Sequence, residues 1–282
     1  MKRVLITGAH SYLGDKTREY LLKTGHFEVD ILDMLDEKWR VCDFSRYDVV
    51  FNVCAIVHRF EKTDEKLYFQ VNKDLAIEIA KKAKKESVKQ FIQTSTVGVF
   101  GVELGEMSEK FGYHPKTPYE RSKYAADIEL DKLRDDSFKV CIIRPPIIYG
   151  KGCKGNFPKL EKFAIRFSIF PDRKNRRDMI YIKNMCDFVG FAISNELNEN
   201  CYPRDKESVC VAKMVEKISK LNNKNIHLCK ALNPIITLLY RFSHKLRSVF
   251  GDNYCTENVS SIDWTPPYDL NTALAEMYEV SK

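Results

Sequence analysis

The sequence predicts an α/β fold, in which a Rossmann-type doubly wound parallel sheet carries a smaller C-terminal substrate-binding lobe. Three observations lead to this prediction. Short apolar stretches alternate with helical patterns over residues 1–150, a glycine-containing turn directly follows the first apolar stretch, and the alternation fades after Gly150. Alternating strands and helices are typical of parallel sheets covered by helices. We therefore expect a Rossmann domain over residues 1–150 and a mainly substrate-binding lobe over residues 151–282.

The first elements form a strand–helix–strand unit. Residues 2–7 predict a short buried strand, residues 15–24 a helix that stops at Gly25, and residues 27–32 a second strand. Such a unit begins a parallel sheet. The stretch that follows has room only for a very short third strand at residues 40–43.

Later segments repeat the same alternation. The expected strands span residues 49–54, 90–93 and 140–143, and the expected helices span residues 67–84 and 117–133. Beyond them, residues 178–195 predict a strand and a helix that return to the main sheet.

Charge and cysteine content exclude several classes of protein. The net charge is +7, but the basic residues are not gathered with interleaved aromatic residues, which argues against a nucleic-acid partner. The nine cysteines are scattered without any C-x-x-C pair, so we expect reduced thiols and neither a disulfide framework nor a zinc or other metal site. The N-terminus lacks a signal-peptide pattern and no stretch has the apolar length of a membrane span, so we expect a cytoplasmic protein.

The turn after the first strand predicts a phosphate-binding site. Gly8 and Gly14 frame it, with Ser11, Tyr12 and Leu13 between them, and a helix follows directly. Backbone N–H groups at such a helix start face a pyrophosphate, Gly8 suits the tight turn, and Gly14 lets the helix approach the sheet. The alternative is a tight turn without a ligand.

An acidic residue at the end of the second strand predicts the choice of cofactor. Asp33 follows Gly14 by 19 residues and is placed to accept hydrogen bonds from the adenosine ribose. Because its carboxylate repels a 2′-phosphate, NAD is favoured over NADP. The alternative is an ordinary turn residue. Asp43 and Phe44 are further candidates, for lining the adenine.

One of four Y-x-x-x-K pairs has the sequence context of a catalytic pair. The four are Tyr12/Lys16, Tyr119/Lys123, Tyr202/Lys206 and Tyr278/Lys282. Context selects the second, since Thr117 followed by Pro118 and Glu120 is typical of a capping box at a helix start. Residues four apart share one face of a helix, so the Tyr119 and Lys123 side chains lie together.

The chemistry of this pair is acid–base catalysis. A free phenol has a pKa of about 10, and we expect the Lys123 ammonium to lower that of Tyr119 so that the phenol exchanges a proton near neutrality. Lys123 would also hold the nicotinamide ribose. A hydroxyl from residues 93–97, at the end of the fourth main strand, is expected to bind the substrate oxygen.

With these residues in place, the chain resembles the NAD-dependent epimerase/dehydratase family of extended short-chain dehydrogenases/reductases. The resemblance rests on seven motifs that occur in family order. They are VLITGAHSYLG (4–14), DVVFNVCA (48–55), VNKDLA (71–76), FIQTSTVGVFG (91–101), TPYERSK (117–123), RPPIIYGKG (144–152) and RRDMIYI (176–182). The motifs are most similar to a bacterial surface-polysaccharide subgroup described as UDP-glucose 4-epimerase-like or as 4-keto-sugar reductases.

The resemblance implies a role for each matched position. Tyr119 is the acid/base, Lys123 its partner and Thr96 the catalytic hydroxyl. The positions that line the cofactor are Ala55, Asn72 and Pro146, and those that contact the nucleotide-sugar are Asn156 and Arg177.

Three features depart from the family pattern. Ser11 replaces a glycine, Phe100 replaces a tyrosine, and the third-strand region is short. The alternative interpretation of Arg177 is a solvated basic run. His58 and His114 are interpreted as ordinary polar residues.

These observations predict an NAD-dependent nucleotide-sugar 4-epimerase that acts through a 4-keto intermediate, in surface polysaccharide biosynthesis. A UDP-linked sugar is the expected substrate and a homodimer the expected assembly. The alternatives are a 4-keto reductase that uses NAD(P)H and a catalytically silent NAD(P)-binding regulator. Residues 234–250 predict an amphipathic helix. This helix either packs within the small lobe or forms a dimer contact, or else it lies on the inner face of the membrane.

Overall fold

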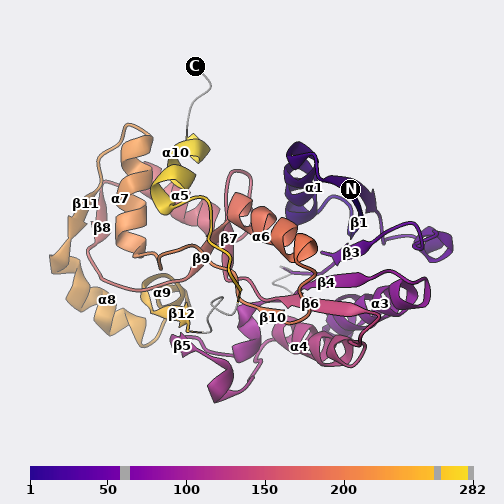
Figure 1. The fold of residues 1–282 in the computed structure, drawn as a ribbon. Coiled ribbons are helices and arrows are strands. Elements are labelled where there is room, and N and C mark those ends of the chain that lie inside the picture. Colours follow the sequence, from indigo (N-terminus) through magenta and orange to yellow (C-terminus); the bar gives the residue numbers. More distant parts are fainter. Residues whose placement is uncertain (58–63, 257–261, 279–282) are drawn as a thin grey trace.

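The computed structural model describes residues 1–57, 64–256 and 262–278. Its centre is a six-stranded, fully parallel sheet (Figure 1). In spatial order the strands are β2 (Phe27–Leu32), β1 (Lys2–Thr7), β3 (Val49–Asn52), β4 (Gln90–Thr94), β6 (Lys139–Ile143) and β10 (Asn200–Cys201). The strand order reverses between β1 and β3. Ligands of doubly wound sheets bind beyond the carboxyl ends of the strands at such a reversal.

Helices cover both faces of the sheet, as the sequence predicted. α1 (Tyr12–Thr24) and α6 (Ile182–Ser194) pack on one face, and α3 (Ala76–Lys85) and α4 (Pro118–Asp131) pack on the other (Figure 1). Strand residues alternate between the two faces, so that Ile6 belongs to the buried cluster under α1 and α6 while Leu5 belongs to the cluster under α3 and α4. The sheet is therefore the middle of three layers.

The helix expected at residues 67–84 is present as three consecutive segments. α2 (Glu65–Phe69) passes into a π-helical turn, η2 (Gln70–Leu75), and then into α3. Single π-helical turns of this kind are frequent at functional sites.

The prediction of a short third strand at residues 40–43 is wrong. Residues Glu37–Val41 form a 3-10 helix, η1, which Asp36 caps by accepting a hydrogen bond from the backbone N–H of Lys38. This compact turn buries Trp39 to 2% exposure against the α3 side of the sheet, which an extended edge strand would not do. β2 is consequently the edge of the sheet.

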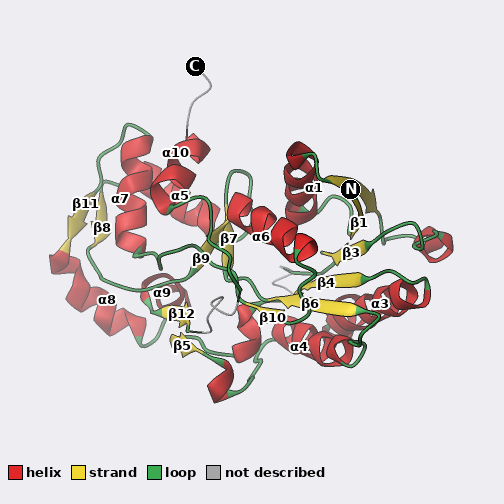
Figure 2. Cartoon of the chain, viewed as in Figure 1, coloured by secondary structure: helices red, strands yellow, loops and turns green. Residues whose placement is uncertain are grey.

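The remaining elements are short and lie mainly in the C-terminal part. The strands are β5 (Gly105–Met107), β7 (Ile147–Tyr149), β8 (Ile169–Pro171), β9 (Met179–Tyr181), β11 (His227–Cys229) and β12 (Asn253–Cys255). The α-helices are α5 (Phe157–Arg166), α7 (Val211–Leu221), α8 (Asn233–Tyr240), α9 (His244–Phe250) and α10 (Leu270–Tyr278), and the 3-10 helices are η3 (Val97–Phe100), η4 (Glu109–Phe111) and η5 (Lys230–Leu232). The six strands form three separate parallel pairs, β7 with β9, β5 with β12, and β8 with β11 (Figure 2).

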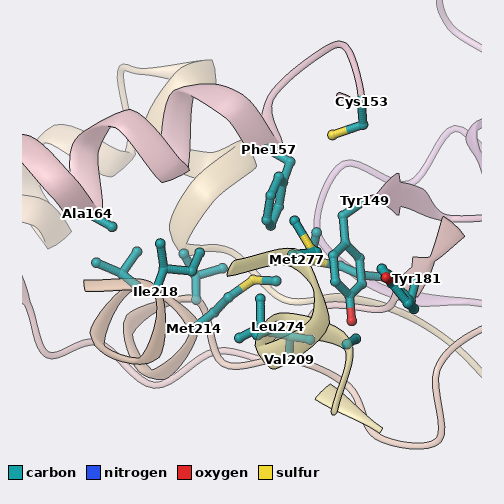
Figure 3. Close-up of a cluster of buried hydrophobic side chains, with 14 of the residues drawn as sticks. Tyr149, Cys153, Phe157, Ala164, Tyr181, Val209, Met214, Ile218, Leu274 and Met277 are labelled. Carbon is teal, nitrogen blue, oxygen red and sulfur yellow. The ribbon is translucent and has the colours of Figure 1, made fainter. Parts of the chain in front are cut away.

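The C-terminal part has a hydrophobic core of its own, which we call the C-terminal cluster. It is built from buried residues between Tyr149 and Met277, and Figure 3 shows Phe157, Met214 and Leu274 pointing into it from α5, α7 and α10. Among the described residues, no helix has the length and apolar character needed to cross a membrane.

Candidate functional site

The predicted phosphate-binding turn lies where the strand order reverses. Gly8 has a φ of +110°, and a Cβ there would lie 2.9 Å from the backbone N of Cys54 at the end of β3, so only glycine fits. A Cβ on Gly14 would lie 2.6 Å from the Ser11 hydroxyl. That hydroxyl accepts a hydrogen bond of 3.0 Å from the Gly14 N–H and caps α1. Ser11, the departure from the family glycine, therefore starts the helix whose N-terminus faces the site.

The two residues between this cap and Gly14 connect the turn to other parts of the chain. The Tyr12 hydroxyl donates to the Lys151 carbonyl at 3.2 Å, and burial raises the pKa of this phenol above its ordinary value. Leu13 packs partly buried against the core. The Tyr12 side chain thus attaches the start of α1 to the loop after β7, and Leu13 attaches it to the core.

Of the residues predicted to hold the adenosine, Asp33 lies at the carboxyl edge of the sheet. Asp33 follows β2 directly, and one carboxylate oxygen accepts a hydrogen bond of 3.0 Å from the Leu35 N–H. Asp43 is exposed and accepts hydrogen bonds from both the N–H and the hydroxyl of Ser45. The Phe44 ring does not line a surface for adenine, because it is fully buried in the core.

Asn72 positions the segment that follows β3. It is fully buried in the π-helical turn, where its amide accepts from the Ile56 N–H at 2.8 Å and donates to the Ile56 carbonyl and to the Ser122 hydroxyl, both at 3.1 Å. This amide thus holds the partly buried Ala55 segment against α4, and the role of Asn72 in lining the cofactor stays a prediction. Pro146 lies partly buried between β6 and β7.

The helix start that selects the Tyr119/Lys123 pair is confirmed. The Thr117 hydroxyl accepts from the Glu120 N–H at 3.2 Å, and the Glu120 carboxylate accepts from the Thr117 N–H at 2.9 Å. This capping box fixes the first turn of α4, on which Tyr119 stands.

The three predicted catalytic groups meet at the end of β4. The hydroxyl of Thr96 lies close enough to that of Tyr119 to favour its ionised form, and it accepts a hydrogen bond from the Gly98 N–H at 3.0 Å. The Lys123 ammonium is buried to 2% exposure and donates to the Thr94 carbonyl at 2.8 Å. Burial lowers the pKa of Lys123 to about 8, against the opposing effect of the Asp127 carboxylate.

The prediction that the pKa of Tyr119 is lowered is wrong. Burial raises the pKa of the phenol, the charges of Asp127 and Glu120 raise it further, and the nearby Thr96 hydroxyl acts in the opposite direction. Desolvation of a phenolate thus outweighs the attraction on which the sequence argument relied. Tyr119 is protonated at neutral pH and suited to donate a proton.

A buried ion pair behind the catalytic lysine was missed by the sequence argument. Asp127 accepts from the Ser95 hydroxyl at 2.8 Å and from the Arg144 guanidinium at 3.0 Å, and both charged residues are 2% exposed. Arg144 also donates to the hydroxyls of Tyr113 and Tyr202, at 2.8 and 2.5 Å. The pair joins α4 to β6 next to Lys123. Its signal in the sequence is the spacing of four residues from Lys123 to Asp127.

The two predicted substrate contacts differ in their surroundings. Arg177 is 8% exposed, which excludes the interpretation as a solvated basic run. Its guanidinium donates to the Gly251 carbonyl at 3.2 Å, and among the described residues no carboxylate lies within 4.0 Å of it. Asn156 is exposed at the start of α5, and its side chain does not cap that helix.

The remaining predicted residues are not part of this site. The exposed His114 ring is hydrogen-bonded to the Phe111 carbonyl, which fits an ordinary polar role. His58 lies outside the described residues. All nine cysteines are free thiols, and no group of three possible ligands for a metal occurs in the described ranges.

Comparisons with known proteins agree with this arrangement. Residues 4–202 match the family model of the NAD dependent epimerase/dehydratase family. The chain is 25% identical, over 91% of its length and 83% of the relative's, to an N-acetyl-α-D-glucosaminyl-diphospho-ditrans,octacis-undecaprenol 4-epimerase of Escherichia coli O157:H7. It is 30% identical to a UDP-glucose 4-epimerase of Vibrio cholerae, over 60% of this chain and 57% of that protein.

Solved structures share the fold. A UDP-N-acetylglucosamine 4-epimerase from Bacillus cereus superposes with a TM-score of 0.76 at 15% identity, covering 99% of this chain and 98% of the other. A UDP-glucuronic acid 4-epimerase from the same organism, solved with NAD, gives a TM-score of 0.75 at 19% identity, covering 98% and 95%.

The ion pair behind Lys123 generates a prediction about its titration. Asp127→Asn removes the negative charge that raises the Lys123 pKa, so this pKa should fall below about 8. An NMR titration of the ¹³Cε signal of Lys123 measures the change. Glu129→Gln, which removes an exposed carboxylate from the same helix, is the control and should leave the titration unchanged. An unshifted titration in Asp127→Asn would contradict the coupling.

Proposed function

Because the chain belongs to the NAD dependent epimerase/dehydratase family, we propose that it is an NAD-dependent 4-epimerase of a diphosphate-linked sugar. The substrate is a nucleotide-sugar, with UDP as the nucleotide, and the reaction passes through a 4-keto intermediate. The observation that carries this proposal is the meeting of Thr96, Tyr119 and Lys123 at the end of β4. Both curated relatives named above are 4-epimerases, which favours this function over the 4-keto reductase that the same residues would serve.

The residues at the sheet edge fit a dinucleotide. The N-terminus of α1 and the Gly8 turn offer N–H groups to a pyrophosphate, and Asp33 offers a carboxylate to the ribose. When bound there, NAD⁺ would supply the acceptor for the hydride of the sugar C4 and a positive charge that stabilises a phenolate. A catalytically silent regulator would not need Thr96, Tyr119 and Lys123 together.

Tyr119 moves the proton of the C4 hydroxyl. Its raised pKa favours the protonated phenol, which donates to the oxygen of the 4-keto sugar when that sugar is reduced again. In the first half of the reaction, when C4 is oxidised, removal of the proton from the C4 hydroxyl requires the Tyr119 phenolate. The Lys123 ammonium stabilises this phenolate below a pH of about 8. Thr96 holds the oxygen that gains and loses this proton.

Arg177 supplies the cation for the diphosphate. A guanidinium buried without a carboxylate partner is costly, and an anionic ligand that accepts bidentate hydrogen bonds relieves that cost. A diphosphate linked to undecaprenol, the substrate class in the name of the Escherichia coli relative, has the same chemistry at this position as a nucleoside diphosphate. This relative also favours a role in surface polysaccharide biosynthesis.

The proposal extends to the organisation of the protein. Residues 1–150 and 178–195 hold the cofactor, and residues 151–282 mainly hold the substrate, with Asn156 as a second contact. We further propose that the enzyme is a homodimer. We also propose that it is cytoplasmic, since nucleotide-sugars are cytoplasmic metabolites.

Incubation with UDP-glucose, UDP-GlcNAc and their C4 epimers, followed by separation of the products, tests the activity. Absence of interconversion with all four, and with a polyprenyl diphosphate sugar, would contradict it.

The first prediction for this function concerns the proton transfer. Tyr119→Phe should lower kcat by a factor of about 10² to 10⁴, the usual contribution of general acid–base catalysis, while the affinity for NADH stays nearly unchanged. Tyr124→Phe on the same helix is the matched control, because its hydroxyl makes no hydrogen bond to the described residues. A Tyr119→Phe variant within a few-fold of wild-type kcat would remove Tyr119 from the mechanism.

The second prediction concerns the diphosphate. Arg177→Ala should raise KM for the sugar substrate about tenfold or more and spare NADH binding, since charge-assisted hydrogen bonds contribute about 1.5–3 kcal/mol. Arg176→Ala removes the neighbouring exposed guanidinium, which bonds to the Ser208 hydroxyl, and should leave KM unchanged. An unchanged KM in Arg177→Ala would refute the assignment.

The third prediction concerns the cofactor. With Asp33 at the ribose, NADH should bind more tightly than NADPH in a fluorescence titration, because the carboxylate repels the 2′-phosphate. Asp33→Ala should narrow this preference. Tighter binding of NADPH by the wild type would instead indicate that Lys38 or Arg40 holds the 2′-phosphate.

A further inference from the structure

A stripe of apolar side chains runs along the outer face of α8. Ile235, Leu238, Leu239 and Phe242 are 56%, 64%, 47% and 82% exposed. Their spacing of three and four residues places them on one side of the helix and of the turn that follows it. Exposed apolar residues are ordinary when they are scattered, but a continuous stripe of four large ones is a feature of interaction sites. We call these four residues the α8 stripe.

The fold attaches α8 to the rest of the protein by the opposite face only. Ile236 and Tyr240 are partly buried against the C-terminal cluster, and no residue of α8 is fully buried. Arg173 strengthens this attachment, since it donates to the Thr237 hydroxyl at 2.8 Å and its guanidinium lies 4.8 Å from the centre of the Tyr240 ring. Figure 1 shows α8 at the lower left edge of the molecule, on the far side from the parallel sheet. The α8 stripe therefore points away from the core that the helix helps to close.

The sequence around the α8 stripe is strongly basic. Residues 217–251 contain seven Lys and Arg residues and no Asp or Glu. Lys230 and Arg241 stand exposed at the two ends of α8, and among the described residues neither forms an ion pair. Arg247 contributes less, because it is paired with Glu103 at 2.7 Å. An apolar stripe flanked by unpaired cations is complementary to one surface in particular, the headgroup region of an anionic bilayer.

We propose that the α8 stripe docks the protein on an anionic phospholipid surface. The four apolar side chains enter the boundary between headgroups and acyl chains, and the flanking Lys230 and Arg241 bind the headgroup phosphates. Buried apolar area and attraction between opposite charges both drive the docking, so it weakens in high salt. A contact between two copies of the chain is less favoured, because it would bring the same unpaired cations together.

The docking surface lies close to the proposed diphosphate site. Arg177 donates to the Gly251 carbonyl at the end of α9, and a Cβ on Gly251 would lie 2.8 Å from the Tyr240 hydroxyl of α8. The helix that carries the α8 stripe thus neighbours the same glycine that Arg177 contacts. This consequence rests on the proposed function: a sugar diphosphate carried on a lipid of the docked bilayer would reach Arg177 from that side.

Co-sedimentation of the full chain with vesicles tests the docking and does not depend on activity. Vesicles of phosphatidylcholine alone are compared with vesicles that contain phosphatidylglycerol, each at low and high salt. We expect the protein to pellet with phosphatidylglycerol vesicles at low salt and to be released at high salt. Leu238→Asp combined with Phe242→Asp should weaken this binding at least about tenfold, since burial of one such side chain contributes about 1.5–3 kcal/mol.

Leu35→Asp is the matched control, because Leu35 is 92% exposed at the other end of the chain and should not affect binding. If the double variant does not fold, as judged by circular dichroism, Lys230→Gln with Arg241→Gln tests the same face through its charges and should abolish the salt-sensitive binding. Wild-type protein that stays in the supernatant with phosphatidylglycerol vesicles at low salt would overturn the proposal. So would an α8 double variant that binds like wild type, or one whose only change is from dimer to monomer in light scattering.

Discussion

The burial of the Lys123 ammonium is the constraint on which the site depends. A charge at 2% exposure is tolerated only where other groups replace water, and here the Thr94 carbonyl accepts its hydrogen bond while the Asp127 carboxylate supplies the opposite charge. Asp127 is itself held by Ser95 and Arg144, so β4, β6 and α4 are joined by one polar network. The catalytic lysine cannot be placed without this network, and the network in turn fixes the helix that carries Tyr119.

A second set of polar side chains supports the cofactor edge in the same way. The Thr7 hydroxyl donates to the Asn52 side chain, which donates to that of Gln93, both at 2.8 Å, across the ends of β1, β3 and β4. These groups are fully buried or nearly so, and each is satisfied by a neighbour on the next strand. Buried polar ladders are rigid because every member would lose a hydrogen bond if one strand moved. The turn at Gly8 and the segment after β3 are therefore held at a fixed separation.

Local sequence signals predicted the fold well, and long-range contacts account for the errors. The capping box at Thr117, the glycine turn and the alternation of strands and helices act within a few residues, so they are legible in the sequence. The pKa of Tyr119 was predicted in the wrong direction because an argument from one neighbouring charge leaves out the burial that the whole fold imposes. The prediction of a third strand was wrong for a similar reason. Only the packed structure shows that a 3-10 turn buries Trp39 better than an extended edge strand would. Asp127 had a local signal that went unused, as it follows Lys123 on the same helical face.

Arg177 shows why recognition of the substrate was harder to predict than chemistry. It stands in a basic run that looks solvated in the sequence, yet its backbone pairs with Val209 on one side and Asn253 on the other. These partners lie 32 and 76 positions further along the chain, so its burial is a property of the assembled C-terminal part. The proton-transferring groups sit instead on β4 and α4, which the sheet positions independently. Different elements of the fold thus position the catalytic residues and the substrate-binding residue. Sequence changes around α8 and α9 can therefore alter which diphosphate carrier reaches Arg177 while the Tyr119–Lys123 geometry stays as it is.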